Sequence, residues 1–169
     1  NGNKIITTGG GGAVITNRNN LAKKIKHLAN TAKIKHKWEY IHDNIGYNLK
    51  MPSLNAALGL AQISKIDIFL KAKRKLFYQY SKNFNNLIGI RIFREGKNLK
   101  SNYWLQTLIL DNKYKNLKNK LLNFCYKKKI FIRPTWKLIS NLKPYKKKQK
   151  MNLSGAKNIV DRAINLPSS

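Results

Sequence analysis

Acidic residues are scarce in this sequence. The 169 residues include 6 Asp and Glu against 35 Lys and Arg, which gives a formal net charge of +29. Such an excess points to nucleic acid, an anionic surface or an anionic substrate as the partner. The excess consists mostly of lysines, which are spread along the whole chain beside abundant Asn and Ile. Compositional drift with a solvated surface is therefore the simpler explanation, and electrostatic steering of an anionic substrate is the alternative.

Cysteine and long apolar runs are also lacking. Cys125 is the single cysteine, which excludes an internal disulfide and a cysteine-based metal site, and no metal is expected. Its place between Leu122 and Tyr126 on an apolar helical face predicts a buried, inert thiol. No apolar run approaches the length that crosses a bilayer, and no signal peptide opens the sequence. We expect a cytoplasmic protein, and a C-terminal fragment, because Asn1 is not a methionine and lies inside a motif.

The first stretch, NGNKIITTGGGGAVIT, places one lysine before a glycine-rich turn. Lys4 precedes a β-branched run at residues 5–8, four glycines follow at 9–12, and a second β-branched run covers 13–16. This pattern predicts a strand, a tight turn and a second strand, with the lysine at the entry. On the residues alone, a flexible hairpin with a surface lysine explains it.

The middle of the chain alternates between helical patterns and an aromatic loop. Apolar spacing predicts a helix from Leu21, and Pro52 with the following serine marks the start of a long amphipathic helix that breaks near Ile68. Between them, residues 31–47 have no clear period and are rich in Lys, His and aromatics. That loop is either the wall of a site, a nucleic-acid contact or an ordinary connection. It runs into GYNLKMP at residues 46–52, where an Asn in a turn is commonly structural.

The last part of the chain predicts a small α+β lobe. Strands are expected at residues 88–93, 104–110 and 130–132, and helices at 114–128 and 154–164. The segment IRPTW, residues 132–136, follows the third strand, and NLKPY comes shortly after it. The plain interpretation is a surface Arg133 with a core Trp136, followed by a solvated run of lysines at 146–150.

Three segments in this order resemble the DegT/DnrJ/EryC1/StrS family of sugar aminotransferases. They are residues 1–12, the GYNLKMP segment with the helix after it, and the IRPTW segment with its later Pro-Tyr. The nucleotide-sugar 4-aminotransferases of the legionaminic type are the most similar branch, since other members often carry an acidic residue inside the glycine turn. The resemblance implies an α/β fold of the pyridoxal-phosphate-dependent transferase fold type I, which is aspartate-aminotransferase-like. It divides the chain into 1–52, the incomplete end of a large cofactor domain, 53–87, a connecting helix, and 88–169, a small α+β domain.

The resemblance also implies roles for individual residues. Lys4 would bond covalently to pyridoxal 5'-phosphate, and Asn48 would reach the cofactor phosphate of the neighbouring subunit of a homodimer. Substrate-binding positions follow from the same motifs: Tyr47, Lys50, Arg133 and Trp136. Lys50 stands where the family has arginine, so it keeps the charge without the bidentate fork.

The implied activity is transamination of a nucleotide-linked 4-keto sugar, with an amino-acid donor that we expect to be glutamate. It would belong to surface-polysaccharide or nonulosonic acid biosynthesis. Family members that dehydrate sugars carry histidine at the cofactor position, so Lys4 favours transamination. Residues that the reaction also needs lie upstream of the lysine in this fold, and the chain alone is therefore expected to be inactive. The alternatives are a basic nucleic-acid-binding module and a non-catalytic remnant of the same fold.

Overall fold

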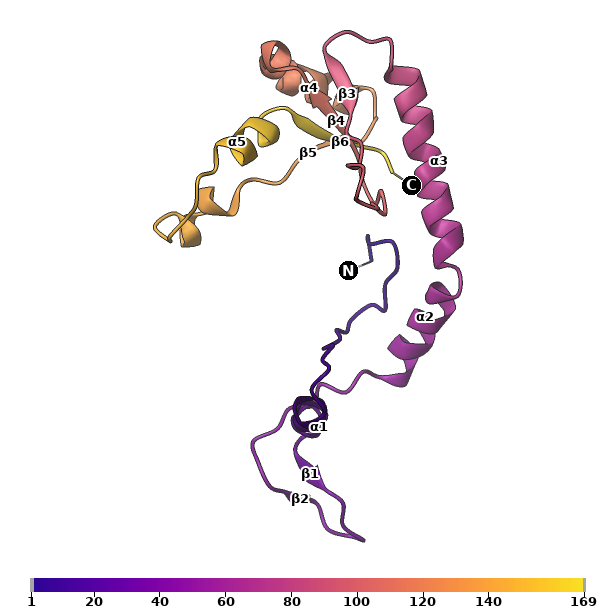
Figure 1. The fold of residues 1–169 in the computed structure, drawn as a ribbon, viewed down its shortest axis with the longest axis vertical. Helices are drawn as coiled ribbons and strands as arrows, with labels where there is room; N and C mark the ends of the chain where they lie inside the picture. Colours follow the sequence, from indigo (N-terminus) through magenta and orange to yellow (C-terminus); the bar gives the residue numbers. More distant parts are fainter. Residues whose placement is uncertain (1, 169) are drawn as a thin grey trace. The chain divides into compact units, whose positions relative to one another are not determined.

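The chain divides into two compact units. A computed structural model describes residues 2–168, and the units comprise Asn1–Ile66 and Asp67–Ser169 (Figure 1). The division falls inside the stretch 53–87 that the sequence suggested as one connecting helix. Among the described residues, no helix combines the length and the apolar character that crossing a membrane requires.

The first unit consists of two helices and a small antiparallel ladder. Its elements in chain order are α1 (Asn19–Leu28), β1 (Lys33–Ile34), β2 (Ile41–His42) and α2 (Ser53–Ile63). β1 pairs with β2, and Lys33 lies opposite His42. The helix predicted from Leu21 is confirmed, and the loop predicted at 31–47 contains this short ladder.

The hairpin predicted for residues 5–16 is wrong. Among the described residues, no strand precedes Lys33. The backbone of Thr7 instead forms hydrogen bonds with the side chain of Gln62 in α2. Because these backbone groups are satisfied by a helix side chain, the β-branched run does not pair across the glycine turn.

The predicted long helix is confirmed, with a break earlier than expected. α2 ends at Ile63, and α3 (Ile66–Phe84) follows after two residues. The N–H of Ser64 bonds to the carbonyl of Leu60 and that of Lys65 to the carbonyl of Gln62, so the turn tightens there. The predicted break near Ile68 therefore lies at residues 64–65.

The second unit is built on a four-stranded antiparallel sheet with the order β3-β4-β6-β5. The strands are β3 (Ile90–Ile92), β4 (Gln106–Leu110), β5 (Arg133–Pro134) and β6 (Ala163–Leu166). Helical elements complete the unit: α3, η1 (Asn112–Leu117), α4 (Lys118–Lys127), η2 (Ile139–Asn141), η3 (Lys143–Tyr145) and α5 (Ser154–Val160). The core joins Leu108, Leu110 and Ile164, with partly buried Leu121 and Leu122 packed against them.

Three local predictions for this unit are wrong. The last helix ends at Val160 and not at residue 164, because the fully buried Ala163 and Ile164 begin β6, which lies between β4 and β5. The third strand lies at Arg133–Pro134 instead of 130–132, on the sheet edge where a proline is tolerated. Cys125 is half-buried, not buried, because α4 covers the sheet with its leucines.

Candidate functional site

The turn that follows Lys4 is fixed to α2 by side-chain amides. Gln62 bonds to both backbone groups of Thr7: its Oε1 accepts from the N–H at 2.9 Å, and its Nε2 donates to the carbonyl at 2.8 Å. Nearer the start of α2, the side-chain amide of Asn55 donates to the carbonyl of Thr8. Two helix side chains seven residues apart therefore hold the backbone just after the lysine.

A glycine in α2 allows this close approach. Gly59 is the one buried residue of α2, and a Cβ there would lie 2.8 Å from Cγ2 of Thr8. Asn55, Gly59 and Gln62 follow the spacing i, i+4, i+7 and so share one face of the helix. On the turn itself, Gly11 has φ +139°, and a Cβ there would lie 2.5 Å from Cε of Met51.

Lys4 itself is exposed, so the described residues do not enclose its side chain. Of the two carboxylates of the first unit, that of Asp43 is bonded to a histidine and that of Glu39 lies farther from one. Nε2 of His27 lies 2.6 Å from Oδ1 of Asp43, and Nδ1 of His36 lies 3.9 Å from Oε2 of Glu39.

The segment that contains Tyr47 and Asn48 is anchored on the end of α1. The N–H of Tyr47 donates to the carbonyl of Leu28 at 2.7 Å, and the N–H of Leu49 donates to that of Ala29 at 2.9 Å. Asn48 forms a β-bridge with Asn30 between these two bonds. The side chains of Tyr47 and Asn48 are exposed, so they are displayed by a backbone that is itself firmly tied down.

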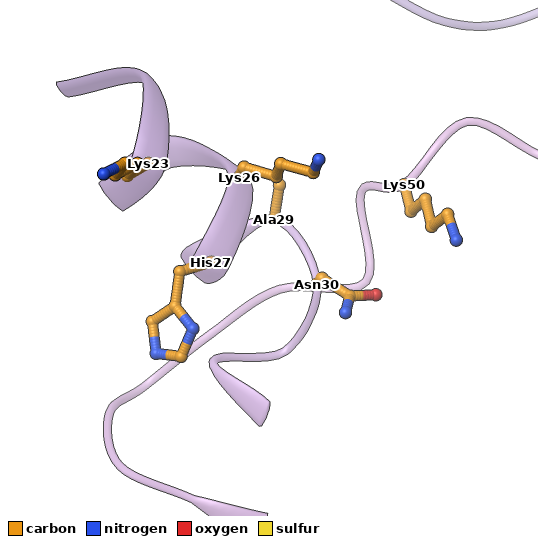
Figure 2. Close-up of a pocket in the computed structure, with 6 residues that line it drawn as sticks. All are labelled: Lys23, Lys26, His27, Ala29, Asn30 and Lys50. Carbon is orange, nitrogen blue, oxygen red and sulfur yellow. The ribbon is translucent and has the colours of Figure 1, made fainter. Parts of the chain in front are cut away.

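Lys50 shares a pocket with basic residues of α1. This cavity of about 430 Å³ is lined by residues of α1 and of the segment that ends at Lys50. Its lining consists of Lys23, Lys26, His27, Ala29, Asn30 and Lys50 (Figure 2). The structure thus brings a substrate-binding candidate from the sequence together with two lysines that the sequence reasoning did not single out.

Arg133 and Trp136 belong to the second unit. Arg133 pairs with Asn165 across the β5–β6 ladder and is exposed, as the plain interpretation expected. Trp136 is 66% exposed, so the expectation of a core tryptophan is wrong. Its ring stacks on that of Trp104 with centroids 6.0 Å apart and planes at 22°, because β5 is an edge strand and the chain leaves it along the surface.

Sequence reasoning missed the residues that position the candidates. Asn55 and Gln62 place polar amides at i and i+7 in an otherwise apolar helix, a signal for a helix face that forms hydrogen bonds with another segment. Lys23 and Lys26 have i, i+3 spacing next to His27, a signal for clustered basic side chains at one end of the helix.

Comparisons with known proteins match the whole chain to one protein family. The profile of the DegT/DnrJ/EryC1/StrS aminotransferase family matches residues 1–169. The GDP-perosamine synthases of Escherichia coli O157:H7 and Vibrio cholerae are 34% and 32% identical over 99% of this chain, which covers 44% and 45% of them. Helicobacter pylori PseC, an aminotransferase involved in the biosynthesis of pseudoaminic acid, superposes with a TM-score of 0.84 at 25% identity, over 96% of this chain and 44% of that one.

The chain belongs to the DegT/DnrJ/EryC1/StrS aminotransferase family. It spans less than half the length of the curated relatives it matches. The predicted α/β fold class, the pyridoxal-phosphate-dependent transferase fold type I, is confirmed by these structural neighbours.

Proposed function

We propose that this chain is part of a pyridoxal-phosphate-dependent aminotransferase that aminates a nucleotide-linked 4-keto sugar, and that Lys4 holds the cofactor. The family match over the full chain and the names of the relatives support the activity. The observation that carries the role of Lys4 is the attachment of its turn to α2 by Gln62 and Asn55. A lysine that must return repeatedly to one reacting atom needs such a fixed backbone.

The residues present fit part of a cofactor site. Lys4 offers an exposed primary amine, and nothing lies within 4 Å of the place that a Cβ of Gly10 or Gly12 would take, so an anionic phosphate could approach the backbone there. The carboxylate of Asp43 is already bonded to His27, and we propose that the acidic partner of the cofactor ring comes from outside residues 1–169. When bound, pyridoxal phosphate supplies an aldehyde for covalent attachment and an electron sink. We therefore propose that residues 1–169 alone do not transaminate.

Lys4 would have two tasks in the reaction. Its Nζ would retain the cofactor by a covalent bond between turnovers, and when displaced by a substrate amine it would carry a proton at Nζ between donor and acceptor carbons. Histidine could carry the proton but would not serve as the amine for attachment. The second task depends on the amine staying near the site after its release, which the bonds from Gln62 to Thr7 secure.

Asn48 and the substrate residues complete the proposal. Asn48 is exposed on a tied backbone, which suits a contact with the cofactor phosphate of a second copy in a homodimer. Tyr47 and Lys50 are proposed to contact the nucleotide-sugar from the same segment. Arg133 and Trp136 are proposed substrate residues of the small domain, and the stack of Trp136 on Trp104 offers a face for a sugar or base. Glutamate is the proposed donor, and the cytoplasm the proposed location.

A chimera tests the role of Lys4. Residues 1–169 would replace the matching segment of the E. coli O157:H7 GDP-perosamine synthase, and the absorbance of lysine-bound pyridoxal phosphate would be recorded. We expect the chimera to show this absorbance, the Lys4→Ala chimera to lose it, and a Lys24→Ala chimera to retain it. Retention in Lys4→Ala would remove Lys4 from its role. Folding is checked by circular dichroism, and the intact synthase is the positive control.

A second function is favoured by one exposed loop. Trp38 and Tyr40 are 73% and 81% exposed, and lysines lie over both rings. Exposed aromatics among lysines suit stacking of single-stranded nucleic acid. This function predicts that a single-stranded RNA binds, and that the logarithm of the binding constant falls linearly with the logarithm of the salt concentration. Loss of this binding in Trp38→Ala would support the function. Absence of binding at low salt would exclude it.

A further inference from the structure

We infer that the end of α4 and the turn after it form a docking surface for an anionic lipid bilayer. We call residues 124–131 the α4 tip, which belongs to the second unit (Figure 1). Its aromatic and aliphatic side chains enter the interface of the bilayer, and its lysines bind the anionic headgroups. The inference is independent of the proposed aminotransferase activity, because no residue proposed for that activity belongs to the α4 tip.

The apolar side chains of the α4 tip are largely uncovered. The exposed fractions are 59% for Phe124, 74% for Tyr126 and 67% for Phe131, and Ile130 is exposed as well. α4 instead packs against the core with its two consecutive leucines. Exposed apolar side chains that gather in one short segment are typical of surfaces that bind a partner or a membrane.

Lysines accompany these apolar side chains. Lys127, Lys128 and Lys129 are consecutive and exposed, and none of them takes part in an ion pair in the described part of the chain. The sequence contains no acidic residue between Asp111 and Asp161. The α4 tip therefore carries positive charge that no carboxylate of its own segment neutralises, and this charge attracts an anionic surface.

The backbone of the α4 tip is fixed by the hydrogen bonds that end the helix. The N–H of Lys129 donates to the carbonyl of Tyr126 at 3.0 Å, and the N–H of Ile130 donates to that of Cys125 at 2.9 Å. These two bonds form a Schellman motif, in which Lys129 is the left-handed residue with φ 58°. Glycine takes this conformation without steric cost, and lysine does not. The chain thus keeps a cation where the backbone favours glycine, which points to a role for the charge.

A bilayer fits this surface better than a nucleic acid does. Phe124, Ile130 and Phe131 have no polar side-chain group, so a partner with an apolar interior is needed to bury them. Lysine suits the same interface, because its stem lies along apolar surface while its ammonium group stays among the headgroups. A nucleic acid would engage the lysines, but Ile130 offers no ring for a base to stack on. Arginine, the better phosphate ligand, is absent from the α4 tip.

Co-sedimentation of the 169-residue chain with lipid vesicles tests the surface. Vesicles of equal parts phosphatidylcholine and phosphatidylglycerol should bind the chain at physiological salt. Vesicles of phosphatidylcholine alone should bind it at least about tenfold more weakly, because each lysine near an anionic surface contributes about fivefold. Equal binding to both kinds of vesicle, or no binding to the anionic ones, would overturn the inference.

Two pairs of charge-neutral variants separate the apolar contact from general attraction. Phe124→Ser/Phe131→Ser should bind the anionic vesicles about tenfold more weakly, since two rings no longer enter the interface. Ile68→Ser/Ile88→Ser likewise replaces one exposed helical and one exposed loop side chain of the same unit, and should bind as the unmodified chain does. Equal losses in the two pairs, or no loss in the first, would overturn the site.

Lys129→Gly separates loss of binding from loss of folding. Glycine relieves the left-handed strain, so this variant should be at least as stable as the unmodified chain in urea unfolding. It should nevertheless bind the anionic vesicles about fivefold more weakly, through the loss of one lysine. Lys75→Gln removes an exposed lysine from α3 and should not change the affinity. An unchanged affinity in Lys129→Gly, or equal losses in the two variants, would overturn the inference.

The phenylalanine pair also distinguishes the bilayer from other anionic partners. Binding of a single-stranded RNA and of polyglutamate would be measured for Phe124→Ser/Phe131→Ser and for the unmodified chain. We expect both affinities to be the same in the two proteins, while binding to the anionic vesicles falls. Weaker binding of RNA or polyglutamate, with vesicle binding unchanged, would assign the surface to that class of partner and overturn the bilayer.

Discussion

The side-chain amide of Gln62 bonds to both backbone groups of Thr7, across 55 positions in the sequence, at 2.9 and 2.8 Å. One glutamine thereby replaces the strand partner that the sequence pattern around Thr7 suggested. It also fixes the backbone three residues after Lys4, so the position of the proposed catalytic amine depends on a residue of α2.

Replacing Gln62 should loosen this turn. In Gln62→Met both hydrogen bonds are lost with little change of side-chain shape, and each contributes about 0.5–1.5 kcal/mol. We expect faster amide hydrogen exchange at Thr7 and a lower unfolding midpoint. Gln79→Met, at an exposed position of α3, is the matched control and should leave both unchanged. Unaltered exchange at Thr7 in the Gln62 variant would contradict the assigned contact.

Gly59 should be intolerant of a methyl group for a local reason. Gly59→Ala improves helix propensity by about 1 kcal/mol, but its Cβ would lie 2.8 Å from Cγ2 of Thr8. We expect the clash to displace the turn and to cancel or reverse that gain in stability. The double variant Gly59→Ala/Thr8→Ser removes the clashing methyl and keeps the hydroxyl, so it should be more stable than Gly59→Ala. Additive effects of the two changes in urea unfolding would show that the residues do not touch.

The second unit should lose stability in acid through Glu95. Its carboxylate accepts hydrogen bonds from Arg74 at 2.6 and 3.1 Å and from the N–H of Ser101, which lower the pKa of Glu95 from 4.5 to about 2. A lowered folded-state pKa stabilises the protein above about pH 4.5, and this stabilisation is lost as the pH falls towards 2.

Urea unfolding at pH 7, 4 and 3 measures this loss. Glu95→Gln should be less stable than the unmodified chain at pH 7 and should lose less stability between pH 7 and pH 3. Asp67→Asn is the control for general charge, and it should keep the original pH dependence. The same pH dependence in Glu95→Gln and in the unmodified chain would exclude Glu95 as the titrating group.

Restoring the family arginine should strengthen anion binding. Lys50→Arg keeps the charge and adds a planar fork that donates two parallel hydrogen bonds to a phosphate. We expect the affinity for a nucleoside diphosphate to rise several-fold in calorimetric titration. Lys65→Arg makes the same change outside the pocket and should have no effect. A weaker or unchanged affinity in Lys50→Arg would argue against a phosphate contact at this position.

Much of the fold was predictable because its signals are local. Residues 21–28 and 54–84 show helical periodicity, and Pro52 marks a helix start, so α1, α2 and α3 followed from the sequence. Ala163 and Ile164 fit a helical period equally well, and only pairing with β4 and β5 makes them a central strand. Such pairing depends on residues 30 to 56 positions away, which no local window contains.

The candidate site was predictable to a different degree. The order of three motifs identified the family and named Lys4, Asn48 and Lys50 as candidates, and their roles stay predictions. What the sequence did not indicate is which elements hold them. Gln62 holds Thr7 through its side chain, and backbone carbonyls at the C-terminal end of α1 accept hydrogen bonds from the segment around Asn48. Both contacts are visible only in the folded structure.

The most direct measurement is to identify the lysine that carries the cofactor. The chimera with the E. coli synthase would be loaded with pyridoxal phosphate, reduced with borohydride to make the attachment permanent, digested and mapped by mass spectrometry. The account predicts that the pyridoxyl group is found on Lys4 alone, and that exposed lysines such as Lys24 and Lys65 remain unmodified. Stoichiometric labelling of any other lysine, with Lys4 unmodified, would contradict it.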